Sequence, residues 1–214
     1  MSQPILYSFR RCPYAMRARM AIYLANISCE LREISLKNKP QAMLEISPKG
    51  TVPVLQLQNA VIEESMQIVH WAFLQNSKSI YLLHDEEIQY AKSMIELFDS
   101  QFKFHLDRYK YHQRYNSEFK HHRVECDKIL HQLDANVSKS IWFFSDRISL
   151  LDIAILPFIR QFKIANPEYF FNQSYQNIIK LLESFENSEI FESVMQKYDL
   201  WRPQGSSKPV LFPS

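Results

Sequence analysis

The stretch Phe9-Arg10-Arg11-Cys12-Pro13-Tyr14-Ala15 decides how this chain begins to fold. The apolar run 5–9 that leads into it is typical of a short buried strand. Pro13 stands where a helix favours its first residue, and the helix-forming run 16–25 follows. Cys12 is therefore predicted at a strand-to-helix turn, where helix-start N–H groups and the helix dipole favour a thiolate over a thiol.

The surroundings of Cys12 suit a nucleophilic sulfur, because Arg10, Arg11 and Arg17 add positive charge. A lone cysteine near a helix start is otherwise more often a small core residue. Ala15 stands where Cys-x-x-Cys redox enzymes carry their second cysteine. We therefore expect a thiol from a partner molecule, and not an intramolecular disulfide, to resolve an oxidised Cys12.

The composition indicates a well-packed, mainly helical protein. Of 214 residues 46% are hydrophobic, which is enough for a sizeable core, and only 2 are glycine, which disfavours a turn-rich β fold. The net charge is +2 without a basic run, so we expect no nucleic-acid partner. Residues 1–80 alone carry +4, which suits an anionic ligand.

The cysteine usage and the hydropathy pattern predict a cytoplasmic protein without a membrane partner. Three cysteines are an odd, sparse set that fits a reducing compartment. The N-terminus lacks the pattern of a signal peptide, and no stretch approaches the ~20 apolar residues of a membrane span.

The predicted fold class is an α/β thioredoxin-like N-terminal domain followed by an all-α helical C-terminal domain. The order β-α-β-α-β-β-α over the first part favours the thioredoxin-like sheet. Ser149 and Asp152 match a capping box in front of an apolar central helix. The expected boundaries are 1–76 for the first domain, 77–83 for a linker, 84–202 for the helical domain and 203–214 for an extended tail.

Four motifs follow one another in the first domain: Cys12-Pro13-Tyr14-Ala15, Leu36-Lys37-Asn38-Lys39-Pro40, Gly50-Thr51-Val52-Pro53-Val54-Leu55 and Glu63-Glu64-Ser65. They resemble the N-terminal domain of omega-class and omega-like glutathione transferases. The capped helix that starts at Ser149 is similar to the central helix of their second domain. The resemblance covers nearly the whole chain and implies the glutathione transferase fold with glutathione as co-substrate. It also implies that Cys12 faces the glutathione sulfur and forms a mixed disulfide with it.

The resemblance further implies which residues hold glutathione. The backbone of Val52, before a cis-proline at Pro53, would pair with the cysteinyl part. Glu64 and Ser65 would hold the γ-glutamyl end, and Lys39 would reach the glycyl carboxylate. Glutathione is extended and anionic, so a strand-edge backbone, a helix N-terminus and a cation are suitable partners.

The function that follows is glutathione-dependent thiol transfer, such as deglutathionylation or the reduction of dehydroascorbate-type acceptors. Two alternatives stay open: conjugation of glutathione to electrophiles, and a non-catalytic protein that binds ligands or partners. Tyr7 and Ser8 are rival activating hydroxyls, but they lie on the strand and not at the helix start. Beside glutathione, the resemblance implies a small electrophilic or disulfide substrate and a homodimer.

Other residues that could bear chemistry lie outside these motifs. Cys29 and Cys126 are predicted to be structural. His122 and Cys126 are four apart on one helix face, but without a second ligand pair we expect a hydrated surface and no metal. The aromatic candidates for an electrophile site are Tyr109, Trp142, Phe162 and Trp201, and five histidines fall in the helical domain: His105, His112, His121, His122 and His131.

Overall fold

The computed structural model describes residues 3–75, 83–202 and 209–213. Their contacts divide the chain into two compact units, Met1–Lys78 with Ser188–Ser214 and Ser79–Asn187. Residues 188–202, which the sequence analysis places in the helical domain, are grouped here with the first unit. Most of the expected linker, and positions 203–208 and 214 of the expected tail, lie outside the described residues.

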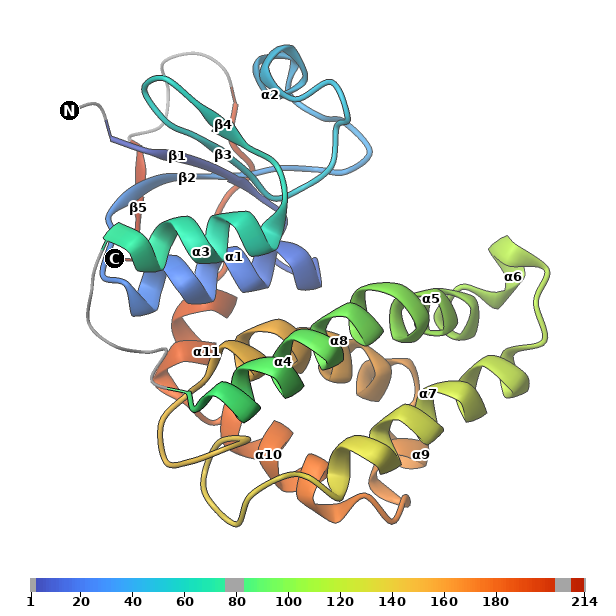
Figure 1. Ribbon diagram of the computed structural model, residues 1–214. Coiled ribbons are helices and arrows are strands. Elements are labelled where there is room, and N and C mark those ends of the chain that lie inside the picture. The colour runs from blue at the N-terminus through green and yellow to red at the C-terminus, as the bar shows by residue number, and fades with distance from the viewer. Residues whose placement is uncertain (1–2, 76–82, 203–208, 214) are drawn as a thin grey trace. The chain divides into compact units, whose positions relative to one another are not determined.

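The first unit is built on a mixed five-stranded sheet with the order β4-β3-β1-β2-β5 (Figure 1). The central pair β1 and β2 is parallel, and every other pair is antiparallel. This β-α-β start with two antiparallel strands beside it confirms the thioredoxin-like sheet. The strands are β1 (Ile5–Ser8), β2 (Cys29–Glu33), β3 (Val54–Gln56), β4 (Val61–Ile62) and β5 (Val210–Phe212).

Among its described residues the first unit also contains the helices α1 (Pro13–Leu24), α2 (Gln41–Ile46), α3 (Ser65–Gln75) and α11 (Glu189–Met195). α1 packs against α3 and α11, and α1 and α3 lie side by side on one face of the sheet (Figure 1). α1 has Pro13 as its first residue, as the sequence predicts, and it is buried from Ala15 to Ile22. The turn before α1 is therefore held between the sheet and a buried helix.

The C-terminal strand β5 corrects the prediction of an extended tail after residue 203. Val210, Leu211 and Phe212 pair antiparallel with β2, with Phe212 opposite Cys29. The side chain of Phe212 is fully buried, whereas Leu211 is exposed. A three-residue strand is too short to show the period of two in the sequence, so only its place beside β2 reveals it.

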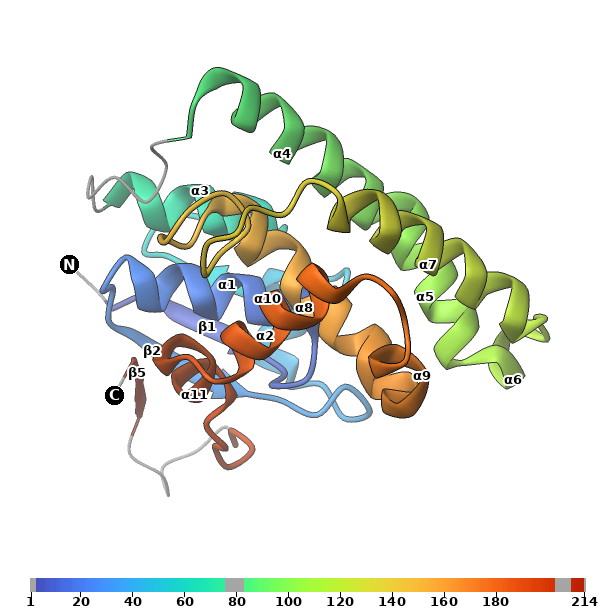
Figure 2. The same ribbon diagram turned by 90° about the horizontal axis from the view of Figure 1, so that it is seen from below.

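The second unit is helical, as predicted. Its helices are α4 (Asp85–Leu97), the π-helical turn η1 (Phe98–Phe102), α5 (Lys103–Lys110), α6 (His112–Tyr115), α7 (Phe119–Asp134), α8 (Leu150–Ala165), α9 (Pro167–Phe171) and α10 (Gln176–Glu186). α5 and α7 pack side by side (Figure 2), and α8 is buried along nearly its whole length. Across the described ranges, each helix is too short or too polar to span a membrane.

The capping box predicted at the start of α8 is present and fully buried. The Asp152 carboxylate accepts hydrogen bonds from the Ser149 backbone N–H (2.8 Å) and hydroxyl (2.6 Å), and the Ser149 hydroxyl accepts one from the Asp152 N–H (3.3 Å). Asp152 also accepts a bond from the Phe143 N–H (3.0 Å), which ties the preceding loop to the helix. Burial raises the pKa of Asp152 to about 6, although these hydrogen bonds oppose the rise.

Replacing Asp152 by Ala should destabilise the protein, because two buried backbone N–H groups and one hydroxyl lose their acceptor. We expect the free energy of unfolding to fall by about 2–4 kcal/mol. Urea denaturation measures the change. The matched control is Asp146→Ala, since Asp146 is exposed and accepts one bond from the Ile141 N–H (3.3 Å). Equal stability of the two variants would contradict the capping role.

Candidate functional site

Cys12 occupies the N-cap position of α1, as the sequence predicts. Its backbone is extended, its C=O accepts a bond from the Met16 N–H (2.9 Å), and its N–H donates to the Phe9 carbonyl (2.9 Å). The side chain is partly buried, and its sulfur donates to the Val52 carbonyl oxygen at 3.7 Å. The fold therefore brings the proposed nucleophile directly to one of the residues proposed to bind glutathione.

The loop before β3 presents the backbone of Val52 to this sulfur. The Val52–Pro53 peptide bond is cis, and the ladder between β3 and β1 begins only at Val54. The backbone of Val52 is thus not committed to the sheet pairing. Lys39 lies beside the same loop. Its Nζ is 3.3 Å from the position that a Cβ on Gly50 would occupy.

Ser65 begins α3 and lies next to a buried cation. Its hydroxyl, in a side chain only 5% exposed, accepts a bond from Arg17 Nη1 at 3.4 Å. Glu64 precedes it and caps the helix with its C=O, which accepts from the Ile68 N–H (3.0 Å). A helix N-terminus, a hydroxyl and a guanidinium together offer an anion several donors.

The Glu64 carboxylate is exposed and pairs with Lys49, a residue that the sequence analysis did not select. The charge and hydrogen bond of Glu64 raise the pKa of Lys49. Exposed ion pairs of this kind contribute little stability, so a ligand can replace either partner at small cost. The position of Lys49 beside the Gly50-Thr51-Val52 motif was the signal that could have indicated it.

A second buried cation, Arg19, lies behind the Cys12 turn. Its guanidinium donates to the Ser8 hydroxyl (3.0 Å) and to the Arg10 carbonyl (2.5 Å), and it lies 3.7 Å from the Glu33 carboxylate. Burial lowers the pKa of Arg19 to about 10, while attraction to Glu33 and Cys12 opposes that change. Arg19 therefore stays charged at neutral pH, and its charge favours a thiolate at Cys12.

The sequence analysis did not select Arg19, because α1 contains two arginines and only the contacts with Ser8 and Glu33 distinguish this one. The two rival hydroxyls both bond to guanidinium groups. Ser8 accepts from Arg19, and the Tyr7 hydroxyl accepts from Arg32 Nη1 at 2.5 Å. These contacts give each hydroxyl a structural role in the sheet and favour Cys12 as the reactive group.

The other two cysteines are fully buried. Burial raises the pKa of the Cys29 thiol to about 12 and raises that of Cys126 as well. The Cys126 sulfur lies 3.9 Å from the Phe102 carbonyl, whereas His122 bonds to His105 on α5. The side chains of His122 and Cys126 therefore have different partners, although they are four residues apart on one helix.

The aromatic candidates for an electrophile site are mostly packing residues. Tyr109 and Phe162 are buried and in ring contact at 5.3 Å, and Trp142 is buried as well. Trp201 contacts the Tyr7 ring edge-on at 6.1 Å, and Arg32 lies over its face at 4.4 Å.

The cysteines should differ in reactivity. Iodoacetamide applied to the folded protein near neutral pH should alkylate Cys12 and leave Cys29 and Cys126 unmodified, because thiolate character and exposure control the reaction. Peptide mass spectrometry locates the label, and labelling in urea is the control that all three can react. Alkylation of Cys29 at the rate of Cys12 would contradict this assignment.

Comparisons with known proteins match two family models to most of this chain. Residues 6–79 match the model of the glutathione S-transferase N-terminal domain, and residues 84–189 match that of the C-terminal domain. Rat glutathione S-transferase omega-1 is 44% identical over 62 residues, which cover 28% of this chain and only 26% of the rat protein.

Solved structures share the fold. Glutathione transferase Omega 3C from Trametes versicolor has a TM-score of 0.77 at 18% identity, covering 94% of this chain and 92% of that one. A family member from Pseudomonas fluorescens with two glutathione molecules bound has a TM-score of 0.76 at 16% identity, covering 90% and 92%.

Proposed function

Because the chain belongs to the glutathione S-transferase family, we propose that it is a glutathione-dependent thiol transferase with Cys12 as its nucleophile. The observation that carries the proposal is the position of the Cys12 sulfur, at the start of α1 and 3.7 Å from the Val52 carbonyl. The buried charge of Arg19 behind this turn favours the thiolate form. The partial match to an omega-class transferase supports a cysteine-based member of the family.

Glutathione binds, in this proposal, across the first unit. The Val52 backbone pairs with its cysteinyl group, which directs the glutathione sulfur to Cys12. The γ-glutamyl end lies at the start of α3, where Ser65, Glu64 and the nearby Arg17 provide polar partners. Lys39 takes the glycyl carboxylate. The bound glutathione of the similar Pseudomonas fluorescens structure supports this ligand class.

The reaction consists of two thiol–disulfide exchanges. The Cys12 thiolate attacks the glutathionyl sulfur of a mixed disulfide, the substrate S–S bond breaks, and the substrate leaves as a thiolate that takes up a proton. Cys12 is then bound to glutathione through a disulfide. A second glutathione thiolate attacks the glutathionyl sulfur, releases glutathione disulfide and regenerates the Cys12 thiolate. The net reaction converts the mixed disulfide and one glutathione into the substrate thiol and glutathione disulfide.

The conjugating alternative uses bound glutathione thiolate as the nucleophile toward an electrophile. A cysteine beside that sulfur is poorly suited to this task, because it tends to be oxidised into a disulfide with the cofactor. The non-catalytic alternative does not explain why Cys12, the Val52 backbone and the start of α3 are all available to one ligand.

A mass measurement separates the thiol transferase from the non-catalytic protein. The purified protein is incubated with oxidised glutathione, and its intact mass is measured before and after reduction. We expect one glutathione adduct that is lost on adding reductant, and no adduct in Cys12→Ser, because a hydroxyl cannot form a disulfide. Absence of an adduct on the unmodified protein would favour the non-catalytic function.

Activity assays on the same two proteins complete that test. Thiol transfer to hydroxyethyl disulfide should vanish in Cys12→Ser, whereas conjugation to chlorodinitrobenzene should persist or rise, since serine can hydrogen-bond the glutathione thiolate without trapping it. Full thiol transfer in Cys12→Ser would overturn the mechanism. Loss of conjugation alone would favour the conjugating function.

A second prediction concerns Ser65. Replacing it by Ala removes one hydroxyl contact and should weaken glutathione binding by roughly 0.5–2 kcal/mol. Calorimetric titration measures the affinity, and Ser93→Ala, a change on α4 in the other unit, is the matched control. Equal affinities of the Ser65→Ala variant and the unmodified protein would remove Ser65 from the site.

We also propose that the protein acts in the cytoplasm as a homodimer with a small electrophilic or disulfide substrate. Three free cysteines fit a reducing compartment and support this proposal. Sedimentation analysis of the full chain tests the dimer.

A further inference from the structure

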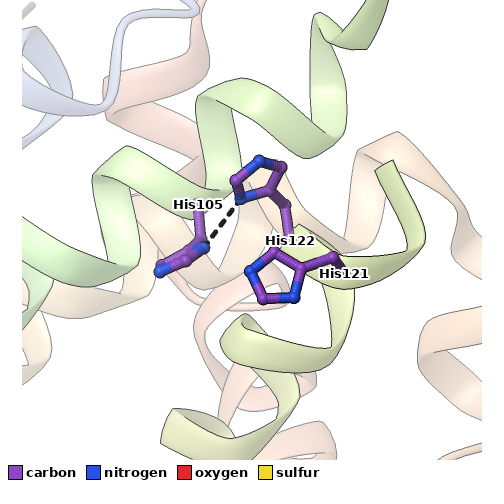
Figure 3. A group of neighbouring side chains, drawn as sticks. All are labelled: His105, His121 and His122. Carbon is purple, nitrogen blue, oxygen red and sulfur yellow. Dashed lines mark hydrogen bonds between the residues drawn. The ribbon is translucent and has the colours of Figure 1, made fainter. Parts of the chain in front are cut away.

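Three histidines from two helices of the second unit meet at one point of its surface (Figure 3). His105 comes from α5, and His121 and His122 come from the first turn of α7. One ring nitrogen from each residue lies within 4.8 Å of the other two. His105 Nδ1 and His122 Nδ1 are hydrogen-bonded at 2.8 Å, so each ring points its nitrogen at the other.

The chemistry of the group suits a transition-metal ion. Imidazole nitrogen is a preferred ligand of Zn²⁺, Ni²⁺ and Cu²⁺, whereas Mg²⁺ and Ca²⁺ prefer oxygen. A metal ligand must be the neutral imidazole, and an Nδ1–Nδ1 hydrogen bond requires that at least one ring be neutral. Partial burial lowers the pKa values of His105 and His122, and neighbouring cations act in the same direction.

We propose that His105, His121 and His122 bind one Zn²⁺ or similar transition-metal ion between α5 and α7, with water in the fourth position. Three histidines and an open position are an established ligand set for zinc. This site belongs to the helical unit and is independent of the glutathione chemistry proposed for the first unit.

The surrounding charges are mixed. The Glu125 carboxylate lies one turn along α7 from His121. Its hydrogen bond to Lys128 is the largest cause that lowers its pKa, and attraction to His121 and His105 acts in the same direction. Lys128 pairs with Glu125 at 2.7 Å, and Arg108 lies over the Phe104 ring at 3.4 Å. Glu125 therefore puts a negative charge near the three histidines, while Lys128 and Arg108 each engage another side chain.

The ion requires only a small rearrangement. Tetrahedral coordination with Zn–N bonds of about 2.0–2.1 Å separates two ligand nitrogens by about 3.4 Å. His105 and His122 must therefore move apart slightly from 2.8 Å, and the His121 nitrogen lies within 4.8 Å of both before any movement. His121 is exposed, so its ring can rotate without disturbing the core.

The test is calorimetric titration of Zn²⁺ into the full chain without an affinity tag, after alkylation of Cys12 to remove a competing thiol. We expect one ion per chain, and binding weakened by about a hundredfold or more in His105→Gln and in His121→Gln. His131→Gln is the matched control, because His131 is an exposed histidine of the same helix, in ring contact with Tyr175 at 5.1 Å, and it should bind as the unmodified protein does.

The melting temperature gives a second measurement that does not depend on activity. Zn²⁺ should raise it in the unmodified protein and in His131→Gln, and should leave it unchanged in His121→Gln, because a ligand of the folded state stabilises that state. Removing the exposed His121 ring should not impair folding, and circular dichroism checks this. The proposal is overturned if the unmodified protein does not bind Zn²⁺ or if His121→Gln binds it equally well.

Discussion

The buried guanidinium of Arg19 is the interaction on which the arrangement around Cys12 depends. It connects the end of β1 through Ser8, the end of β2 through Glu33, and the turn before α1 through the Arg10 carbonyl. The Arg10 N–H donates in turn to Glu33 at 2.7 Å, so the turn is held from both sides. The net stabilisation from such a buried pair is small because of its desolvation cost. Its consequence is instead positional, because it fixes the turn and places a permanent positive charge behind the sulfur.

The second requirement of the site is the register of the sheet. The Cys12 sulfur follows β1, and the Val52 carbonyl that it contacts precedes β3, forty positions later in the chain. These two segments meet because β1 pairs antiparallel with β3, with Leu6 opposite Leu55. Since a slip of one residue would move every side chain to the other face, the buried pair Leu6 and Leu55 fixes which backbone groups face Cys12.

Local signals explain what the sequence could predict. The strand, the proline and the helix-forming run placed Cys12 at a helix start, and the spacing of Ser149 and Asp152 identified their mutual capping. The features that the sequence could not predict depend on contacts between distant segments of the chain. Arg19 reads as an ordinary helix charge until the ends of β1 and β2 surround it, and His105 meets His121 and His122 only because α5 packs on α7. Single-residue patterns contain no information on such pairings.

The position at which Cys-x-x-Cys enzymes carry their second cysteine is filled by a buried alanine in this protein. Ala15, which occupies that position, is fully buried in a cluster with Tyr7 and Val52, against which Cys12 packs. A disulfide formed by Cys12 must therefore be opened by a thiol that approaches from solvent. Because Val52 offers its backbone beside the sulfur, an extended, peptide-like thiol can align itself there through main-chain hydrogen bonds. Under the proposed mechanism the same surface thus selects both the attacking thiol and the glutathionyl group that it removes, which is why one cysteine is sufficient.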